Sequence, residues 1–270
     1  MLQGVSTISL PDVALSLEAC GRGSALVLVH GFGGDRSTWD GAWKALGRDR
    51  RLLRYDLRGF GQSIERDDQT FSHARDLEAL LDAMGIRRCD LVGVSMGGAV
   101  ALNFALDRPA RVRRLVLVSP GLVAWDWSED WRALWRPIVE AAVSGDLAQA
   151  RELWWTHPLF ETTRSTPAAA ELLRKSILSY SGRHWVEGDR QEPALPDLDR
   201  LHLLAAPTLL LTGSRDLDDF RLIAGLIEAA APDLRRKDYA GAGHLLHLEQ
   251  PKAFNRDVLA FLGESPTSAP

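Results

Sequence analysis

The sequence has few cysteines, no excess of positive charge and no long apolar run. Its two cysteines, Cys20 and Cys89, lie far apart in the 270-residue chain, so they form neither a disulfide framework nor a metal-binding spacing. The net charge is −4 at pH 7 and the basic residues are scattered, which excludes an electrostatic case for nucleic acid. The longest uncharged stretch, Leu91 to Leu106, is interrupted by glycines, so we expect no membrane span.

The overall composition is that of an ordinary globular protein, with 46% hydrophobic and 25% charged residues. The first residues contain no basic segment leading into an apolar one, so we expect no signal peptide and a cytoplasmic protein. The length suits one large domain, or one domain with an inserted lid. We expect a small-molecule substrate and no metal or cofactor, and the sequence leaves a homodimer open.

Strand-like and helical patterns alternate along most of the chain. Alternation of this kind predicts an α/β fold in which a mostly parallel central sheet is flanked by helices. Residues 5–19 resemble one or two antiparallel edge strands, and residues 90–104 resemble a strand, a sharp turn and a helix. Further strands are expected at 25–29, 51–56, 114–119, 207–212 and 234–239, and further helices at 39–46, 70–84, 219–231 and 251–262.

The stretch from 121 to 196 interrupts this alternation. It contains helical patterns without strand-like runs, and seven of the nine tryptophans lie in it. We therefore expect residues 1–120 and 197–270 to form the core and residues 121–196 to form an inserted helical cap. The small, polar tail at 264–270 is expected to fray.

One motif indicates nucleophilic chemistry. Residues 93–97, Gly-Val-Ser-Met-Gly, match G-x-S-x-G, in which a tight turn between strand and helix exposes the serine. Gly93 and Gly97 have no side chain to collide where the two elements pass closely, and the helix N-terminus favours negative charge near Ser95. The alternative is a buried glycine-rich turn without chemistry.

A serine nucleophile needs a base and an acid that orients the base. His244 follows a glycine-rich loop after the last expected strand, whereas His247 is expected to pack in the next segment. Asp216 follows the strand ending at 212, with Asp218 and Asp219 as rivals and a solvated acidic loop as the alternative for all three. These residues fall at strand carboxyl ends, where ligand sites of such sheets lie.

The oxyanion formed by serine attack needs backbone N–H donors placed in advance. We expect one donor at Met96, directly after the nucleophile, and one at Phe32 in the loop that starts at His30. Gly31 and Gly33 let that loop approach closely. His30 could itself be catalytic, but a structural role in bracing the loop is favoured.

Taken together, the motifs closely resemble those of the α/β-hydrolase superfamily, in its branch with a cap. The resemblance extends over nearly the whole chain and depends on motifs in the family's order: His30-Gly31, the turn Asp56-x-Arg58-Gly59-x-Gly61-x-Ser63, Gly93-x-Ser95-x-Gly97-Gly98, Asp216 and Gly243-His244. It implies a Ser95–His244–Asp216 triad and a structural role for the turn at Asp56. Branches with an aspartate nucleophile are disfavoured because position 95 is serine.

The substrate side is less defined. Trp127, Trp131 and Trp135 recur on one side of a helix, either packing the cap onto the core or lining an apolar pocket. Relatives that are enol-lactonases imply a substrate contact at Trp154 or Arg132, and Gly31 is expected to contact the substrate as well. The prediction is a serine esterase or lactonase; the alternatives are a C–C bond hydrolase of vinylogous diketones and a small-molecule sensor.

Overall fold

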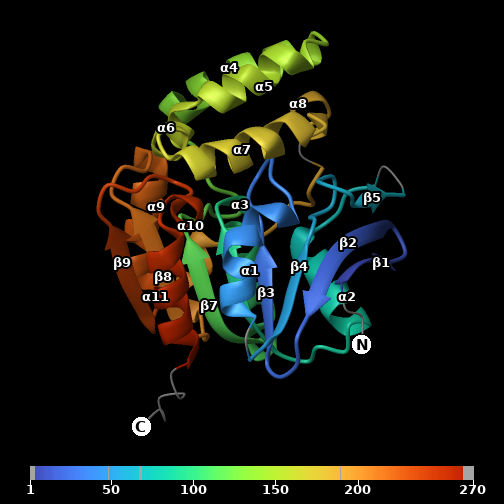
Figure 1. Cartoon of the computed structure of the whole chain (residues 1–270), viewed down its shortest axis with the longest axis vertical. Coiled ribbons are helices and arrows are strands. Elements are labelled where there is room, and N and C mark those ends of the chain that lie inside the picture. The colour runs from blue at the N-terminus through green and yellow to red at the C-terminus, as the bar shows by residue number, and fades with distance from the viewer. Residues whose placement is uncertain (1–3, 48, 67–68, 189, 264–270) are drawn as a thin grey trace.

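The computed structural model of the chain describes residues 4–47, 49–66, 69–188 and 190–263, and the tail at 264–270 lies outside this range. The described residues form a nine-stranded sheet with strand order β1-β2-β4-β3-β6-β7-β8-β9, in which the short β5 also pairs with β2 (Figure 1). The strands are β1 Gly4–Ser9, β2 Val13–Cys20, β3 Ala25–Val29, β4 Arg51–Tyr55, β5 Ile64–Glu65, β6 Cys89–Val94, β7 Val112–Val118, β8 Thr208–Gly213 and β9 Leu234–Tyr239.

The sheet is parallel from β4 to β9 and antiparallel at its β1–β2 edge. The central strands β3, β6 and β8 are buried at every position, as expected of strands covered on both faces. The predicted α/β fold with a mostly parallel sheet is therefore confirmed. Strand β5 was not predicted, because two residues are too few to show a periodic pattern.

Helices cover both faces of the sheet and bury two separate cores. On one face, Leu28 of β3 packs in a cluster with Trp39 and with Phe254 of helix α11. On the other face, Val27 and Val29 share a cluster with Leu77 of helix α2. Alternate residues of one strand thus serve opposite cores. The covering helices are α1 Asp40–Leu46, α2 His73–Ala83, α3 Met96–Asp107, α9 Asp218–Ala230, α10 Leu246–Glu249 and α11 Pro251–Gly263, together with the short 3-10 helices η1 Arg36–Trp39, η2 Pro109–Arg111 and η4 Leu198–Leu203.

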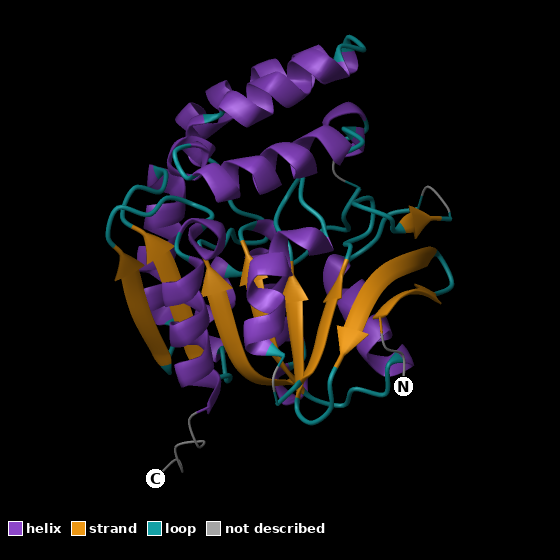
Figure 2. Ribbon diagram, viewed as in Figure 1, coloured by secondary structure: helices purple, strands orange, loops and turns teal. Residues whose placement is uncertain are grey.

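A further group of helices lies beyond the upper ends of the parallel strands in Figure 1. This group, the upper helices, consists of α4 Glu129–Val143, α5 Leu147–Thr156, α6 Glu161–Arg164, α7 Pro167–Ser179 and α8 Arg183–Val186, with the 3-10 helix η3 Pro158–Phe160. Figure 2 shows that α7 lies between the α4–α5 pair and the loops that leave the strands. The described residues between 121 and 196 form no strand, although Gln191 makes an isolated bridge to Phe71. The division into core and cap stays a prediction.

Within the described ranges, no helix is both long and apolar enough to span a bilayer.

Candidate active site

Ser95 lies at the sharp turn between β6 and α3, in a backbone conformation rare for a residue with a side chain. Its φ is 55° and its ψ is −120°. Three hydrogen bonds hold the backbone of Ser95 in this strained conformation. Its N–H donates to the carbonyl of Val118 at 2.9 Å, and its carbonyl accepts from the N–H groups of Ala99 at 3.0 Å and Gly121 at 3.1 Å. The surrounding backbone therefore fixes the direction of the Ser95 side chain.

The two motif glycines have no space for a side chain. A Cβ on Gly93 would lie 2.2 Å from the carbonyl oxygen of Gly97. A Cβ on Gly97 would lie 2.3 Å from the carbonyl oxygens of Val29 and His30, at the end of β3. Both contacts are with backbone, which cannot move aside, so the turn requires glycine at both positions.

The loops after β8 and β9 bring together one acid and one imidazole. The Nδ1 atom of His244 lies 3.0 Å and 3.1 Å from the two carboxylate oxygens of Asp216. Both side chains are almost fully buried, at 1% and 2% exposure. Asp218 is exposed, Asp219 accepts hydrogen bonds from the α4 N-terminus, and His247 packs in the core below. Of the sequence candidates, the structure pairs only Asp216 with His244.

Two residues that support this pair were not predicted. A Cβ on Gly213 would lie 2.1 Å from the carbonyl oxygen of Gly243, so glycine is needed where the two loops touch. The carboxylate of Glu249 accepts from the Gly243 N–H at 2.6 Å and from the Thr163 hydroxyl at 2.6 Å, which ties the His244 loop to α6. The position of Gly213 directly after an apolar run is a sequence signal that could have indicated its role. The contacts of Glu249 leave no local pattern in the sequence.

Ser95 and His244 line one cavity of about 1010 Å³ beneath the upper helices. Gly31, Phe32 and Met96 line it too, so the predicted nucleophile, base and oxyanion loop share one space. The Nε2 atom of His244 is buried and has no hydrogen-bond partner among the described residues. Ser95 and Nε2 therefore form no hydrogen bond here; catalytic hydrogen bonds often tighten only when substrate binds.

The N-terminus of α3 points its first amides toward the same cavity. Met96 is the first residue of this helix, and the first amides of a helix have no acceptor within it. The positive end of the helix dipole adds to their attraction for an anion. Met96 and Ser95 line the same cavity, and the role of the Met96 N–H as an oxyanion donor stays a prediction.

His30 braces the loop that carries Phe32. Its Nε2 accepts from the Leu57 N–H at 2.9 Å, and its Nδ1 lies 2.8 Å from the carbonyl oxygen of Gly31. Burial lowers the pKa of this imidazole, so it is neutral at pH 7, with Nδ1 as the donor. His30 does not line the cavity, and both ring nitrogens are occupied.

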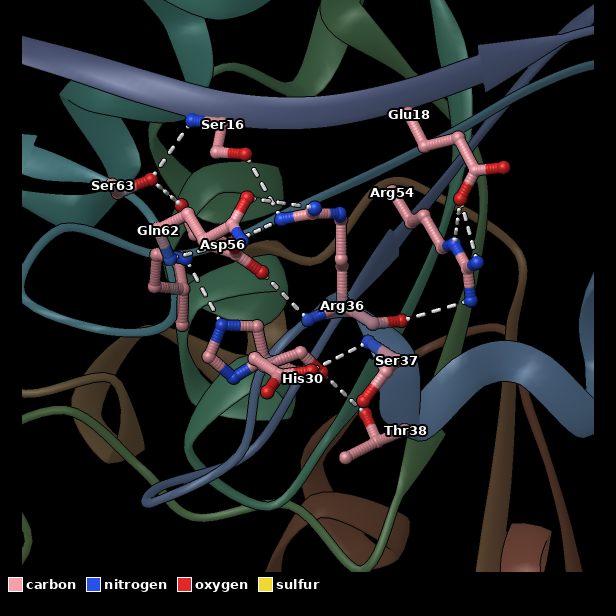
Figure 3. Close-up of polar contacts among 12 residues, drawn as sticks. Ser16, Glu18, His30, Arg36, Ser37, Thr38, Arg54, Asp56, Gln62 and Ser63 are labelled. Atoms are coloured by element: carbon pink, nitrogen blue, oxygen red, sulfur yellow. Dashed lines mark hydrogen bonds and ion pairs between the residues drawn. The ribbon is translucent and has the colours of Figure 1, made fainter. Parts of the chain in front are cut away.

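The turn that follows β4 supports the same loop, as Figure 3 shows. The Asp56 carboxylate accepts from the backbone N–H of Arg36 at 2.8 Å and of Gln62 at 2.9 Å, and it pairs with the Arg36 guanidinium. The Ser63 hydroxyl donates to the Asp56 carbonyl at 2.6 Å. Arg58 is buried in ion pairs away from the cavity lining. These contacts join the turn to η1 and α2 and involve no residue of the cavity lining, which agrees with the expected structural role.

The Phe32 side chain anchors its loop against the upper helices. Its ring centroid lies 5.2 Å from that of Trp135 and 5.9 Å from that of Trp154. The indole nitrogen of Trp154 would lie 3.0 Å from a Cβ on Gly33, so this indole also packs on the loop backbone. Trp154 lines the cavity, whereas its neighbour Trp155 faces Arg174 outside it.

The third predicted substrate contact, Arg132, lies at the rim. It lines the cavity, but its side chain is 49% exposed and paired with Asp126. Gly31 lies deeper, where a Cβ would be 3.2 Å from the Ser95 Cβ. In the part of the chain that the structure describes, no group of three or more His, Cys, Asp or Glu side chains could hold a metal ion.

The comparisons with known proteins agree with this architecture. The 2-hydroxy-6-oxo-2,4-heptadienoate hydrolase of Pseudomonas putida is 29% identical over 277 residues, covering 93% of each chain. An esterase from Thermogutta terrifontis superposes with a TM-score of 0.79 at 28% identity, covering 96% of this chain and 97% of its own. The enol-lactonase of Burkholderia xenovorans LB400 shares the fold, with a TM-score of 0.81 at 22% identity, covering 96% of this chain and 100% of its own. The model of the alpha/beta hydrolase fold matches residues 24–251, so the chain belongs to the alpha/beta hydrolase fold family.

Proposed function

We propose that this α/β hydrolase cleaves a carboxylic ester or lactone, with Ser95 as nucleophile, His244 as base and Asp216 as the acid that orients it. The observation that carries the proposal is the buried Asp216–His244 pair, whose imidazole lines the same cavity as a serine held at φ 55°. Strain of this kind persists where function requires a fixed geometry.

The proposed reaction begins with proton transfer from the Ser95 hydroxyl to Nε2 of His244, while the serine oxygen bonds to the substrate carbonyl carbon. The N–H groups of Phe32 and Met96 donate to the resulting oxyanion. His244 then returns the proton to the leaving alcohol oxygen, which leaves an acyl group on Ser95. A water that gives its proton to His244 attacks this acyl carbon, and the acid and the Ser95 hydroxyl are released.

Asp216 stays ionised throughout in this proposal. Its carboxylate accepts from Nδ1–H of His244, which leaves Nε2 as the basic nitrogen facing the cavity. It also stabilises the imidazolium formed in each step. The upper helices act as a cap that keeps bulk water from these charges.

Cleavage of a C–C bond is a second candidate, because one relative is named a hydrolase of a heptadienoate. The same triad would then act on a vinylogous diketone. Rapid turnover of a coloured ring-fission product, with poor turnover of p-nitrophenyl esters, would favour this candidate over ester cleavage.

The test of the proposal is Ser95→Ala with p-nitrophenyl butyrate as substrate. We expect hydrolysis to fall to the rate in buffer while the thermal melt stays near that of the wild type. Ser181→Ala, at an exposed serine, is the matched control and should keep full activity. A fluorophosphonate should label Ser95 alone, and more slowly in His244→Ala. Wild-type activity in Ser95→Ala would end the serine mechanism.

A further inference from the structure

A continuous series of aromatic rings connects the proposed base, His244, with Phe32 in the proposed oxyanion loop. The imidazole of His244 lies 4.3 Å from the ring of Phe220, which lies 5.5 Å from Trp131. Trp131 lies 6.1 Å from Trp135, whose indole is 5.2 Å from Phe32 (all between centroids). Phe32, Trp131, Trp135 and Phe220 all line the cavity. We call the rings of Phe32, Trp127, Trp131, Trp135 and Phe220 the aromatic wall.

Three indoles of this wall form a stack. Trp131 and Trp135 lie on α4, whereas Trp127 lies just before its N-cap, so the expectation that all three share one helix is wrong for Trp127. Trp127 and Trp131 are separated by 4.6 Å at 24°, and Trp131 and Trp135 by 6.1 Å at 15°. All three are only partly buried and line the cavity, so part of each ring remains open to it. Indole faces and edges favour offset or edge-on contact with another aromatic ring.

In the described part of the chain, the cavity lining has no unpaired Asp, Glu, Lys or Arg side chain to match this large apolar surface. Among the described residues that line it, the only Asp, Glu, Lys or Arg side chains are Arg132, Arg136 and Glu192. The two arginines are exposed and Glu192 is partly buried, and each is paired, with Asp126, Glu129 and Arg75 respectively.

Two buried histidines of the lining, His73 and His247, add no positive charge either. Burial lowers the pKa of His73 and of His247 to about 3, so neither is a cation at pH 7. A carboxylate brought against the aromatic wall would lose its hydration without gaining a free cation, which is costly. An uncharged ring would meet indole and phenyl surfaces.

We infer that the part of the substrate buried here is uncharged and aromatic: a neutral aryl-bearing ester or lactone rather than one whose ring carries a carboxylate. The inference rests on the proposed function for the reacting group, but the preference for a neutral ring follows from the cavity alone. The volume of about 1010 Å³ lies at the upper end of the range for ligand sites, so it accommodates a ring beside the ester.

Binding to the Ser95→Ala variant tests the charge preference without turnover. The probes are methyl hydrocinnamate and its para-carboxamide and para-carboxylate derivatives, measured by calorimetry at pH 7.5. The carboxamide and carboxylate have nearly the same shape, so their difference isolates the charge. We expect the carboxylate to bind at least ~10-fold more weakly than the carboxamide. Equal or tighter binding of the carboxylate would overturn the inference.

The aromatic wall is tested in the wild-type background with Trp131→Leu. We expect the KM for methyl hydrocinnamate to rise about 5-fold or more, with less than about a 2-fold change for methyl butanoate, because only the ring contacts the wall. Trp155→Leu, in a neighbouring helix but facing away from the cavity, is the matched control and should change neither. Trp127→Leu repeats the test if Trp131→Leu does not fold. Equal changes for both esters would refute the role of the wall.

The two arms separate this inference from the proposed function. If the wild type turns over no ester while Ser95→Ala still prefers the carboxamide, the esterase proposal fails and the substrate preference stands. If esters are cleaved by Ser95 but the carboxylate binds as well as the carboxamide, the mechanism stands and the preference fails.

Discussion

Replacing Asp216 by asparagine tests the acid of the proposed triad with almost no change in shape. In the wild type, both carboxylate oxygens lie within 3.1 Å of Nδ1 of His244. Asparagine has one acceptor and one donor at these positions. If its amide N–H faces Nδ1, that nitrogen becomes the acceptor and the proton moves to Nε2. The imidazole would then present a donor where the mechanism needs a base.

The size of the effect follows from the charge that is lost. Two unit charges 3.0 Å apart, the distance between Nδ1 and the Asp216 carboxylate, interact by about 5.5 kcal/mol at an effective dielectric constant of about 20. This is the stabilisation that the imidazolium loses in the transition state, and it corresponds to about 10⁴-fold in rate. Both side chains are nearly inaccessible to water, so solvent replaces little of it.

The assay is kcat and KM for p-nitrophenyl butyrate in Asp216→Asn. We expect kcat to fall about 10⁴-fold with KM within about 3-fold, because the substitution acts on the base and not on the binding surface. Asp218→Asn is the matched control: this carboxylate is exposed and pairs with Arg221. A loss of kcat in Asp218→Asn that equals the loss in Asp216→Asn would refute the assignment of the acid.

Two further predictions concern stability. Neither ring nitrogen of His247 has a hydrogen-bond partner among the described residues, and burial lowers its pKa to about 3. Its neutral form therefore contributes stability above the unfolded pKa of about 6.5, and this is lost as pH falls toward 3, by about 2 kcal/mol at about pH 5. Urea unfolding of His247→Phe should accordingly be less sensitive to acid than that of the wild type; an unchanged pH slope would contradict this. Gly97→Ala should lower both activity and the thermal melt, because its Cβ would overlap two carbonyl oxygens, whereas Gly225→Ala, in open space on α9, should be neutral or raise stability by up to about 1 kcal/mol. A wild-type melt for Gly97→Ala would show that the turn tolerates a side chain.

The fold and the tight turn that carries Ser95 could be predicted because local constraints fix them. A turn as tight as that at Ser95 demands glycine at fixed positions, and the contacts of Gly93 and Gly97 show that demand in atomic terms. Strands buried on both faces show as uninterrupted apolar runs, as in β3 and β8. In both cases the requirement is met within a few residues of chain, where a sequence pattern can show it.

Contacts between distant segments left no such pattern. Glu249 accepts hydrogen bonds from Gly243 and from Thr163, and Thr163 lies 86 residues before Glu249 in the sequence. No pattern around any of the three residues indicates these contacts. The short β5 depends on the edge of β2 rather than on its own two residues. These features are set by which elements meet in the folded protein, and a single sequence does not show that directly.

The tryptophans of α4 show where the two kinds of information meet. Their spacing predicts one helix face, and it leaves packing and pocket lining as alternatives. The structure places Trp131 in both settings, since it contacts Phe220 and His157 and also lines the cavity. The periodicity of the tryptophans indicates which side of the helix they occupy. It does not indicate what they contact: Phe220, which packs against Trp131, lies on α9, nearly ninety residues further along the chain. Local motifs therefore identify candidate reacting residues. The proposed substrate preference depends instead on how α4 and α9 meet in the folded protein, which only the assembled cavity shows.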